Sequence, residues 1–115
     1  MIPITFDVAL EDILVDEMLF CSILSNALDN AMNAQDSLPR EKQNIKIMLK
    51  NMDGKTLLSV KNTISKAPEF SDGLPVTTRK GHGYGTQSIR YITEKLGGNC
   101  QFSVCDNYFL LRVVL

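Results

Sequence analysis

The sequence is poor in cysteine, and its few cysteines follow no metal-binding or disulfide pattern. The 115 residues contain only Cys21, Cys100 and Cys105, an odd number without a Cys-x-x-Cys pair. Neither a disulfide framework nor a zinc site is indicated, because both use cysteines paired at characteristic spacings. Reduced thiols in a cytosolic protein are the simplest interpretation.

The chain also lacks a strong charge of either sign and any long apolar run. Its formal net charge is −1, which gives no general reason to expect nucleic acid or an anionic membrane as a partner. No apolar stretch is long enough to span a bilayer, and nothing resembles a signal peptide. We expect residues 1–115 to form one globular domain with one modest core.

Glycine is concentrated at one place, where Gly81, Gly83 and Gly85 alternate with other residues directly before the helix-like run QSIRYITEKL. Without Cβ atoms, backbone N–H groups can converge on an anion, and the following helix adds the positive end of its dipole. This pattern predicts a phosphate-binding loop. A plain flexible loop is the alternative, because the pattern alone has little specificity.

The first third of the chain predicts a short strand and then a long helix. Apolar and polar residues alternate over residues 2–8, which is typical of a half-buried strand, and Pro3 favours an edge position. Asp16 suits the N-cap of a helix that we expect to run to about Asp36. Pro39 follows soon after and prevents the helix from continuing.

The expected helix has an apolar face and an unusual polar face. The apolar face is predicted to consist of Phe20, Leu24, Ala27, Leu28 and Ala31. The polar face carries Ser22, Asn26, Asp29, Asn30 and Asn33. Asparagine is a poorer helix former than Glu, Lys or Gln, but it supplies carbonyl oxygens for Mg²⁺ and amide donors for phosphate. The polar face is therefore either a ligand site or a solvated surface.

The remainder predicts two hairpins, one long loop and a second helix. Residues 44–50 and 55–62 alternate around an Asp-Gly turn, and residues 100–115 alternate around Asp106-Asn107. Residues 65–80 show no periodicity and suggest a binding loop, and Gly97-Gly98 ends the second helix. About five strands and two or three helices predict a two-layer α+β sandwich, with the helices on one face of a mixed, mostly antiparallel sheet.

Two common nucleotide-binding patterns are excluded by context. The glycines do not follow Gly-x-Gly-x-x-Gly, and they come after an irregular loop instead of a strand. The Walker pattern is absent as well.

Two segments resemble motifs of the GHKL ATP-binding superfamily, which includes DNA gyrase, heat-shock chaperones, sensor histidine kinases and mismatch-repair ATPases. LSNALDNAMNA is similar to the N box, and GHGYGTQSIRYITEKLGG is similar to the second glycine box. The order and spacing are most similar to those of the quorum-sensing histidine kinases of the accessory-gene-regulator type, whose first glycine box is reduced. The fold that this resemblance implies is the Bergerat α/β sandwich.

The resemblance assigns roles to several polar residues. Asn30 corresponds to the ligand that holds Mg²⁺ against the triphosphate, and Asn33 is expected to contact the nucleotide. Asn26 stands where the ATPase branches place a water-activating Glu; because an amide cannot accept a proton at neutral pH, the kinase branch is favoured. Asn62 corresponds to the residue that accepts a hydrogen bond from the adenine amine, although the glycines that usually follow it are absent.

In the glycine-rich segment, Gly81, Gly83 and Gly85 correspond to the phosphate-side glycines of the family. We expect nucleotide contacts there from Lys80, His82, Tyr84 and Thr86 as well, although no family motif specifies Lys80. The preceding loop corresponds to the ATP lid, from which Arg79 is the alternative to Lys80 as a phosphate-binding cation. His82 is the only histidine. It is interpreted as a loop residue, because the phosphate-accepting histidine of such kinases lies on a separate dimerisation helix.

The resemblance implies the catalytic domain of a two-component sensor histidine kinase, cytoplasmic and part of a longer membrane-anchored bacterial protein whose sensor and dimerisation segments lie outside this chain. It would transfer the γ-phosphoryl group of Mg-ATP to a histidine on the dimerisation helix, from which a response regulator receives it. No contact of this domain with nucleic acid or membrane is expected. Two alternatives remain open: a non-catalytic nucleotide-binding docking module, and a serine kinase of the anti-sigma-factor type.

Overall fold

The computed structural model describes residues 2–10, 12–76 and 84–115 of the chain. Within these residues, a five-stranded sheet has the strand order β1-β2-β3-β7-β6. Its strands are β1 (Ile4–Ala9), β2 (Ile45–Met52), β3 (Lys55–Thr63), β6 (Asn99–Cys105) and β7 (Tyr108–Val114). The helices are α1 (Glu17–Gln35) and α2 (Tyr84–Lys95), with a short 3-10 helix at Arg40–Lys42.

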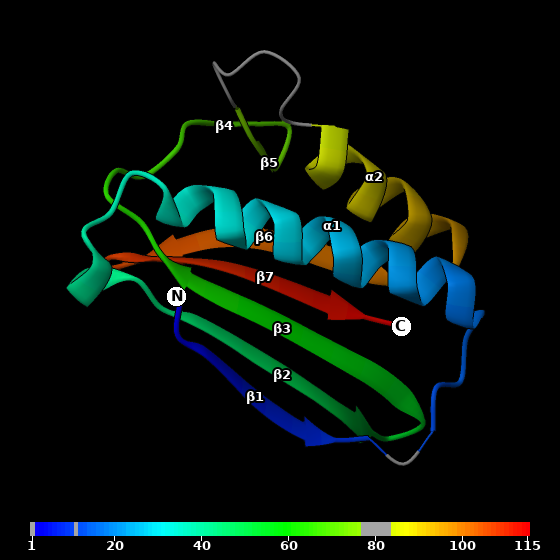
Figure 1. Cartoon of the computed structure of the whole chain (residues 1–115). Coiled ribbons are helices and arrows are strands. Elements are labelled where there is room, and N and C mark those ends of the chain that lie inside the picture. Colours follow the sequence, from blue (N-terminus) through cyan, green and yellow to red (C-terminus); the bar gives the residue numbers. More distant parts are fainter. Residues whose placement is uncertain (1, 11, 77–83) are drawn as a thin grey trace.

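Both long helices lie on the same face of the sheet (Figure 1). Strand β1 runs parallel to β2, whereas the pairs β2–β3, β3–β7 and β6–β7 are antiparallel. The predicted two-layer α+β sandwich with a mixed, mostly antiparallel sheet is thereby confirmed.

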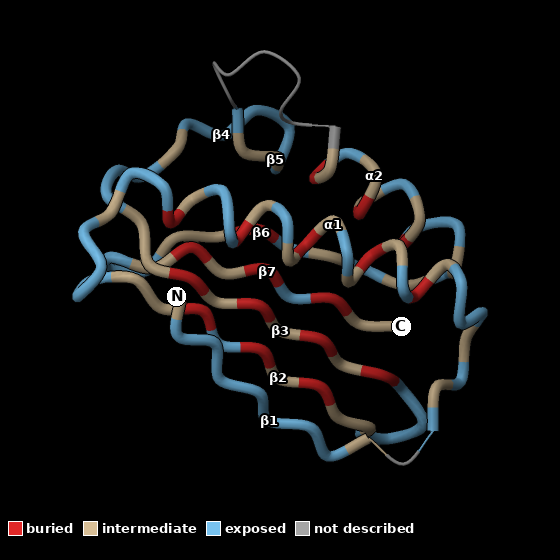
Figure 2. The backbone as a smooth tube through the Cα atoms, in the orientation of Figure 1, coloured by how far each residue is buried: buried red, intermediate tan, exposed pale blue. Residues whose placement is uncertain are grey.

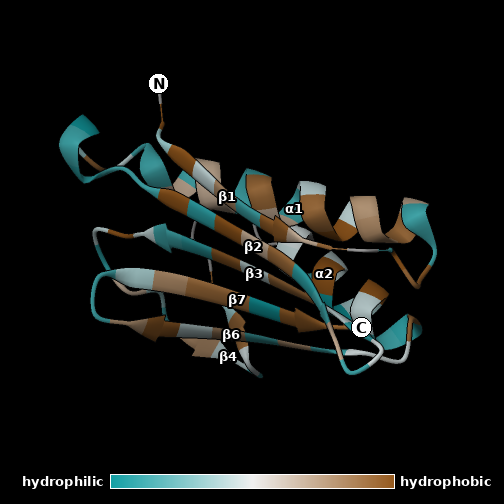
Figure 3. Ribbon diagram, turned by 90° about the horizontal axis from the view of Figure 1, so that it is seen from below, coloured by the Kyte–Doolittle hydropathy of each residue, from teal (hydrophilic) through white to brown (hydrophobic). Residues whose placement is uncertain are grey.

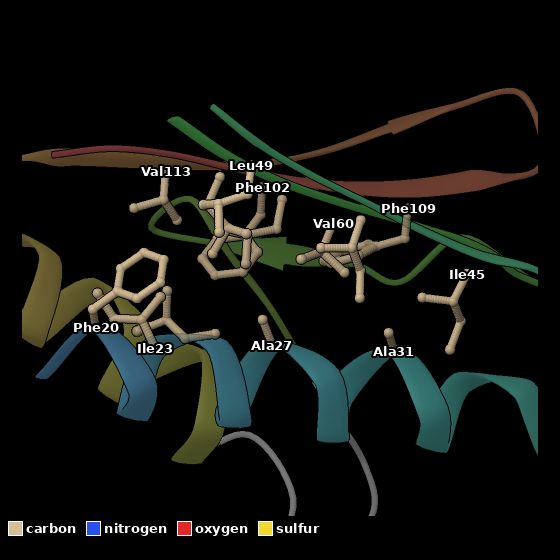
Figure 4. Packing of buried hydrophobic residues seen from close by; sticks show 14 residues of the cluster. Phe20, Ile23, Ala27, Ala31, Ile45, Leu49, Val60, Phe102, Phe109 and Val113 are labelled. Carbon is tan, nitrogen blue, oxygen red and sulfur yellow. The ribbon is translucent and has the colours of Figure 1, made fainter. Parts of the chain in front are cut away.

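The core lies between the helices and the sheet, and it is built from alternate strand residues and one face of α1 (Figure 4). Of the predicted apolar face of α1, Phe20, Ala27 and Ala31 are buried, and the other two members are partly buried against them. Ile23 is completely buried but was not predicted. The described core residues are Phe20, Ile23, Ala27, Ala31, Ile45, Ile47, Leu49, Leu58, Val60, Ile89, Phe102, Phe109, Leu111 and Val113.

The ends of α1 follow the predicted capping pattern. The Asp16 side chain accepts a hydrogen bond of 3.0 Å from the backbone N–H of Leu19, which satisfies one of the free donors of the first turn. The helix ends at Gln35, one residue before the predicted end. Pro39 then precedes the 3-10 helix.

Strand β1 differs from its prediction in burial. It is an edge strand, as predicted, but all six of its residues are exposed, so that the expectation of a half-buried strand is wrong (Figure 2). Phe6 is 62% exposed. Its register partner is the buried Ile47 of β2, which places both side chains on the helix-covered side of the sheet. The reason is that α1 packs over β3, two strands inward, and leaves the edge uncovered.

The two predicted hairpins form around tight turns. Apolar residues alternate with polar ones along β1, whereas β7 is hydrophobic over several consecutive residues (Figure 3). Gly97 ends α2 with a φ of 77°, and its N–H donates to the carbonyl oxygen of Glu94. Helix α2 begins at Tyr84, three residues earlier than the predicted run, and therefore includes Gly85.

The segment predicted as a long binding loop contains a small hairpin, which was not predicted. Strands β4 (Phe70–Ser71) and β5 (Leu74–Pro75) pair antiparallel around Asp72-Gly73. Strands of two residues are too short to show an alternating pattern, and this explains why the sequence did not reveal them.

Candidate functional site

The polar face of α1 meets the beginning of α2. A Cβ atom placed on Gly85 would lie 3.6 Å from Oδ1 of Asn26, so that the glycine faces this asparagine directly. The amide nitrogen of Asn26 donates to the carbonyl oxygen of Ser22, one turn earlier, at 2.9 Å. This bond holds the side chain on the flank of α1 that faces α2. The two motifs predicted to cooperate are therefore adjacent in space.

The first turn of α2 is suited to an anion. The unpaired N–H groups of a helix start and the positive end of its dipole both attract negative charge. No acidic residue occupies this turn. Thr86, which lies there, is only 4% exposed. These features are compatible with the binding of an anion at the start of α2.

Asn30 lies one turn beyond Asn26 on α1 and is half-buried, whereas Asn33 is exposed. A carbonyl oxygen of Asn30 is a suitable ligand for a hard divalent cation. Among the described residues, no group of three or more His, Cys, Asp or Glu side chains could hold a metal ion. Mg²⁺ would therefore fit this face only as an ion shared between an asparagine oxygen and the oxygens of a bound phosphate.

Asn62 lies near the end of β3 and is 1% exposed. Its amide nitrogen donates to the carbonyl oxygen of Thr63 at 3.0 Å. The side-chain carbonyl oxygen is the group that could accept a bond from a base. The residue is almost completely covered, so a hydrogen bond to that oxygen would be shielded from water.

A buried glutamine connects α1 with the end of β3, and the sequence analysis missed it. The amide nitrogen of Gln35 donates to the carbonyl oxygen of Thr63 at 3.0 Å. Its side-chain oxygen accepts from the Thr63 hydroxyl at 3.0 Å and from the backbone N–H of Asn44 at 2.9 Å. Gln35 follows Ala31 by four residues and therefore lies on the apolar face of the helix. A polar residue on that face was the signal in the sequence that could have indicated a buried, hydrogen-bonded side chain. These three hydrogen bonds of Gln35 fix the position of α1, which carries the asparagines, relative to the end of β3, which carries Asn62.

The small hairpin β4–β5 lies beside the start of α2 (Figure 1). The guanidinium of Arg90 on α2 donates to the carbonyl oxygen of Asp72 and, at 3.1 Å, to its carboxylate. The Phe70 ring stacks on Phe109 of β7 with a centroid distance of 6.4 Å and an interplanar angle of 8°. Neither contact was predicted, because both join residues far apart in the sequence.

Several predicted site residues lie outside the described residues: Arg79, Lys80, Gly81, His82 and Gly83. Tyr84, Gly85 and Thr86 form the beginning of α2. Of the predicted set, the structure brings together Asn26 and Gly85, and it places Asn62 at the strand end to which Gln35 anchors α1.

A separate hollow of about 670 Å³ opens at the end of the sheet. Its lining comes from the chain between α1 and β2, the end of β3 with the residues after it, and the β6–β7 turn, and includes Lys42, Thr63, Asn107 and Tyr108. None of the predicted nucleotide-binding residues lines it. It is therefore distinct from the site between α1 and α2.

Over the described part of the chain, no helix combines the length and the apolarity needed to cross a membrane.

Comparison with known proteins adds the family context. A family profile described as "GHKL domain" matches residues 15–115. The nucleotide-free catalytic domain of histidine kinase ThkA is 26% identical with a TM-score of 0.73, over 97% of this chain and 78% of that one. The mycobacterial sensor histidine kinase MprB is 20% identical with a TM-score of 0.70, over 97% of this chain and 80% of that one.

Full-length ShkA in complex with AMPPNP is 18% identical with a TM-score of 0.72; the match covers 98% of this chain and 25% of that one. No protein with a curated description matches the chain. The fold described above is thus the fold of histidine kinase catalytic domains.

Proposed function

The chain belongs to the GHKL family of ATP-binding domains, and from this membership we propose that it is the ATP-binding catalytic domain of a two-component sensor histidine kinase. In this proposal it transfers the γ-phosphoryl group of Mg-ATP to a histidine on a dimerisation helix outside residues 1–115. The same proposal places the chain in a longer, membrane-anchored bacterial kinase of the quorum-sensing type, with a response regulator as the final acceptor.

The observation that carries the proposal is the juxtaposition of Asn26 on α1 with Gly85 at the start of α2. It brings one asparagine from the polar face of α1 beside the start of a helix, and helix starts attract phosphate. A nucleotide bound there would have its phosphates at the α2 terminus and its metal-binding oxygens toward Asn30. Magnesium, when bound, would neutralise charge that develops on the phosphate oxygens.

The residues on α1 favour phosphoryl transfer to a second protein group over hydrolysis. Asn26 has no basic atom with which to activate water, since an amide does not accept a proton at neutral pH. Phosphoryl transfer depends mainly on the alignment of donor and acceptor and on charge neutralisation. The domain can therefore contribute to the reaction without a general base of its own, provided that the acceptor histidine is brought to the γ-phosphate.

Base recognition is assigned to Asn62, whose carbonyl oxygen would accept a hydrogen bond from the adenine amine. Guanine carries a carbonyl group at the corresponding position and cannot donate there. The buried environment makes the bond selective, because a buried oxygen left without a donor costs about 1–3 kcal/mol.

Calorimetric titration with ATP, with and without Mg²⁺, tests the binding site. The Asn30→Ala variant should lose roughly tenfold or more of its Mg²⁺-dependent affinity, because a contact to a charged group contributes about 1.5–3 kcal/mol. Ser25→Ala, at an exposed position of the same helix, is the matched control and should bind as the wild type does. Equal affinities of the two variants would show that the asparagine face is a solvated surface.

The reaction itself is tested with γ-labelled ATP. The isolated domain should neither label itself nor release phosphate steadily, and it should label the dimerisation helix of its parent kinase when the two are mixed. Acid-labile label on His82, or rapid phosphate release by the domain alone, would contradict the proposal that this domain binds ATP and a separate dimerisation helix carries the acceptor histidine.

A further inference from the structure

The residue assigned to base recognition lies at a buried position beside an aromatic ring. Asn62 is 1% exposed, and its amide nitrogen donates to Thr63, so its carbonyl oxygen is the group that would accept a hydrogen bond from adenine. Its register partner across the sheet is Phe109 of β7, so that both side chains lie on the same, helix-covered face. The floor of a base subsite around Asn62 therefore includes the Phe109 ring.

An aromatic ring already lies on that floor. Phe70 of β4 stacks on Phe109 with the two rings nearly parallel, at 8°. Parallel stacking on an aromatic side chain is also the contact that nucleobases make with proteins. The Phe70 ring thus lies nearly parallel to the Phe109 ring, as a stacked base would, but offset from it with a centroid distance of 6.4 Å.

The segment that carries Phe70 is attached by contacts that are easily released. Strands β4 and β5 pair over two residues each. The ion pair between Arg90 and Asp72 is exposed, with 31% and 91% of the two side chains accessible, and such pairs add little stability. Phe70 itself is 41% exposed. A unit of two short strands, one exposed and one half-buried, opens locally at low free-energy cost.

We propose that Phe70 occupies the base subsite of the nucleotide-free domain and that adenine takes its place on the Phe109 ring. The inference rests on the proposed ATP-binding function and deepens it. Phe109 becomes the stacking surface for the base, Asn62 its hydrogen-bond acceptor, and Phe70 a competitor that belongs to the chain itself. ATP binding then includes the displacement of the β4–β5 hairpin from Phe109.

The Phe70→Ala variant tests the competition. Removal of the ring should raise the affinity for ATP by about threefold to tenfold, the range expected when one aromatic contact no longer has to be broken. Inorganic tripolyphosphate, which has no base, should bind equally well to the wild type and the variant. Val76→Ala is the matched control, because Val76 is an exposed apolar residue just beyond β5; its affinity for ATP should not change.

A second variant follows the ring directly. The chain contains no tryptophan, so Phe70→Trp introduces a single fluorophore at the proposed subsite. ATP should shift its emission to longer wavelength, because the indole moves from Phe109 into water. Tripolyphosphate should leave the emission where it was.

Two results would overturn the inference while the proposed function stands. A loss of ATP affinity in Phe70→Ala, with tripolyphosphate binding intact, would mean that the ring supports the bound base instead of competing with it. Unchanged ATP affinity would mean that Phe70 lies outside the path of the base. If neither wild type nor variants bound ATP or tripolyphosphate, the proposed function would fall, and this inference with it.

Discussion

Two hairpins of this domain have the same type of turn but differ in the length of their strands and in how deeply those strands are buried. The β2–β3 hairpin reverses at Asp53-Gly54, with φ values of 54° and 77°, and the β4–β5 hairpin reverses at Asp72-Gly73, with φ values of 53° and 76°. Both use a two-residue Asp-Gly turn with positive φ, which suits the twist of antiparallel strands. The first continues into a ladder of eight residue pairs, the second into a ladder of two.

The difference shows that turn chemistry determines where a chain reverses, whereas burial determines how firmly the reversal is held. In β3, alternate residues from Thr56 to Asn62 are buried under α1. In β4 both residues are exposed, and in β5 both are half-buried. We therefore expect the β2–β3 hairpin to open only when the whole domain unfolds and the β4–β5 hairpin to open separately.

The largest effect is expected from truncating one leucine in each hairpin. Leu58→Ala, at a site that is 2% exposed, should lower the free energy of unfolding by about 2–5 kcal/mol, because it leaves a cavity in the core. Leu74→Ala, in half-buried β5, should lower it by less than about 1 kcal/mol. Denaturant unfolding followed by circular dichroism measures both. Similar losses would mean that the small hairpin belongs to the same cooperative unit as the sheet.

The same substitution at the turn glycine of each hairpin, Gly54→Ala and Gly73→Ala, tests whether the two hairpins unfold together, because both variants introduce the same backbone strain. A Cβ on Gly54 would meet no atom within 4 Å, and one on Gly73 would meet only the end of the Arg90 side chain at 3.7 Å. Alanine therefore fits sterically at both positions. The main destabilisation in each variant comes from holding a residue with a Cβ atom at a positive φ, which costs about 1–2 kcal/mol. Gly54→Ala should lower global stability by this amount, whereas Gly73→Ala should leave it unchanged.

Amide hydrogen exchange measures the local effect of Gly73→Ala on the β4–β5 hairpin. Protection should fall only in the β4–β5 segment, whose opening the strain favours. A drop in the global unfolding free energy equal to that of Gly54→Ala would remove the distinction between the two hairpins.

A smaller effect is expected from breaking the ion pair that ties the small hairpin to α2. Asp72→Asn removes the charge and keeps the size of the side chain, so the unfolding free energy should change by less than about 0.5–1 kcal/mol. The N–H of Val76, which donates to the carbonyl oxygen of Glu69 at 2.7 Å, should exchange faster in this variant. Unaltered exchange at Val76 would show that the ion pair does not hold the hairpin.

The smallest effect concerns the thiol that shares Arg90 with the hairpin. Burial raises the pKa of the Cys100 thiol, and the positive charge of Arg90 partly opposes this. Because the folded-state pKa is the higher one, the thiol stabilises the fold below the unfolded pKa of about 8.5, and this contribution is lost as the pH rises through the folded value.

Arg90→Met should raise the pKa of Cys100 further and slow its alkylation by iodoacetamide at pH 8.5, because less thiolate is present. The exposed Cys21 and Cys105 serve as internal references. Faster labelling of Cys100 in Arg90→Met would mean that loss of packing outweighs loss of charge.

Much of this fold was readable from local patterns. Asp16 caps α1 as predicted, Asp53-Gly54 and Asp106-Asn107 turn the two hairpins of the sheet, and Gly97 ends α2. Each of these signals involves residues within a few positions of one another. Backbone sterics and local hydrogen bonds are sufficient to express them.

The candidate site was predictable only in part. The asparagine spacing on α1 and the glycine before α2 were visible in the sequence, and the structure shows Asn26 and Gly85 in contact. The roles of Asn30 and Asn62 stay predictions. The stacking of Phe70 on Phe109 was not predictable, because it joins two apolar residues that carry no periodic signal in common.

The sequence by itself determined where α1 is capped, where the two hairpins of the sheet turn, where α2 ends, and which polar residue types were available for a phosphate site. Tertiary structure alone decided that β1 is uncovered, that Gln35 is buried between α1 and β3, and that the Phe70 ring stacks on Phe109. The physical reason is the range of the forces involved. Turns and caps depend on neighbouring residues, whereas burial depends on which distant element packs against a surface, and that is settled only when the layers meet.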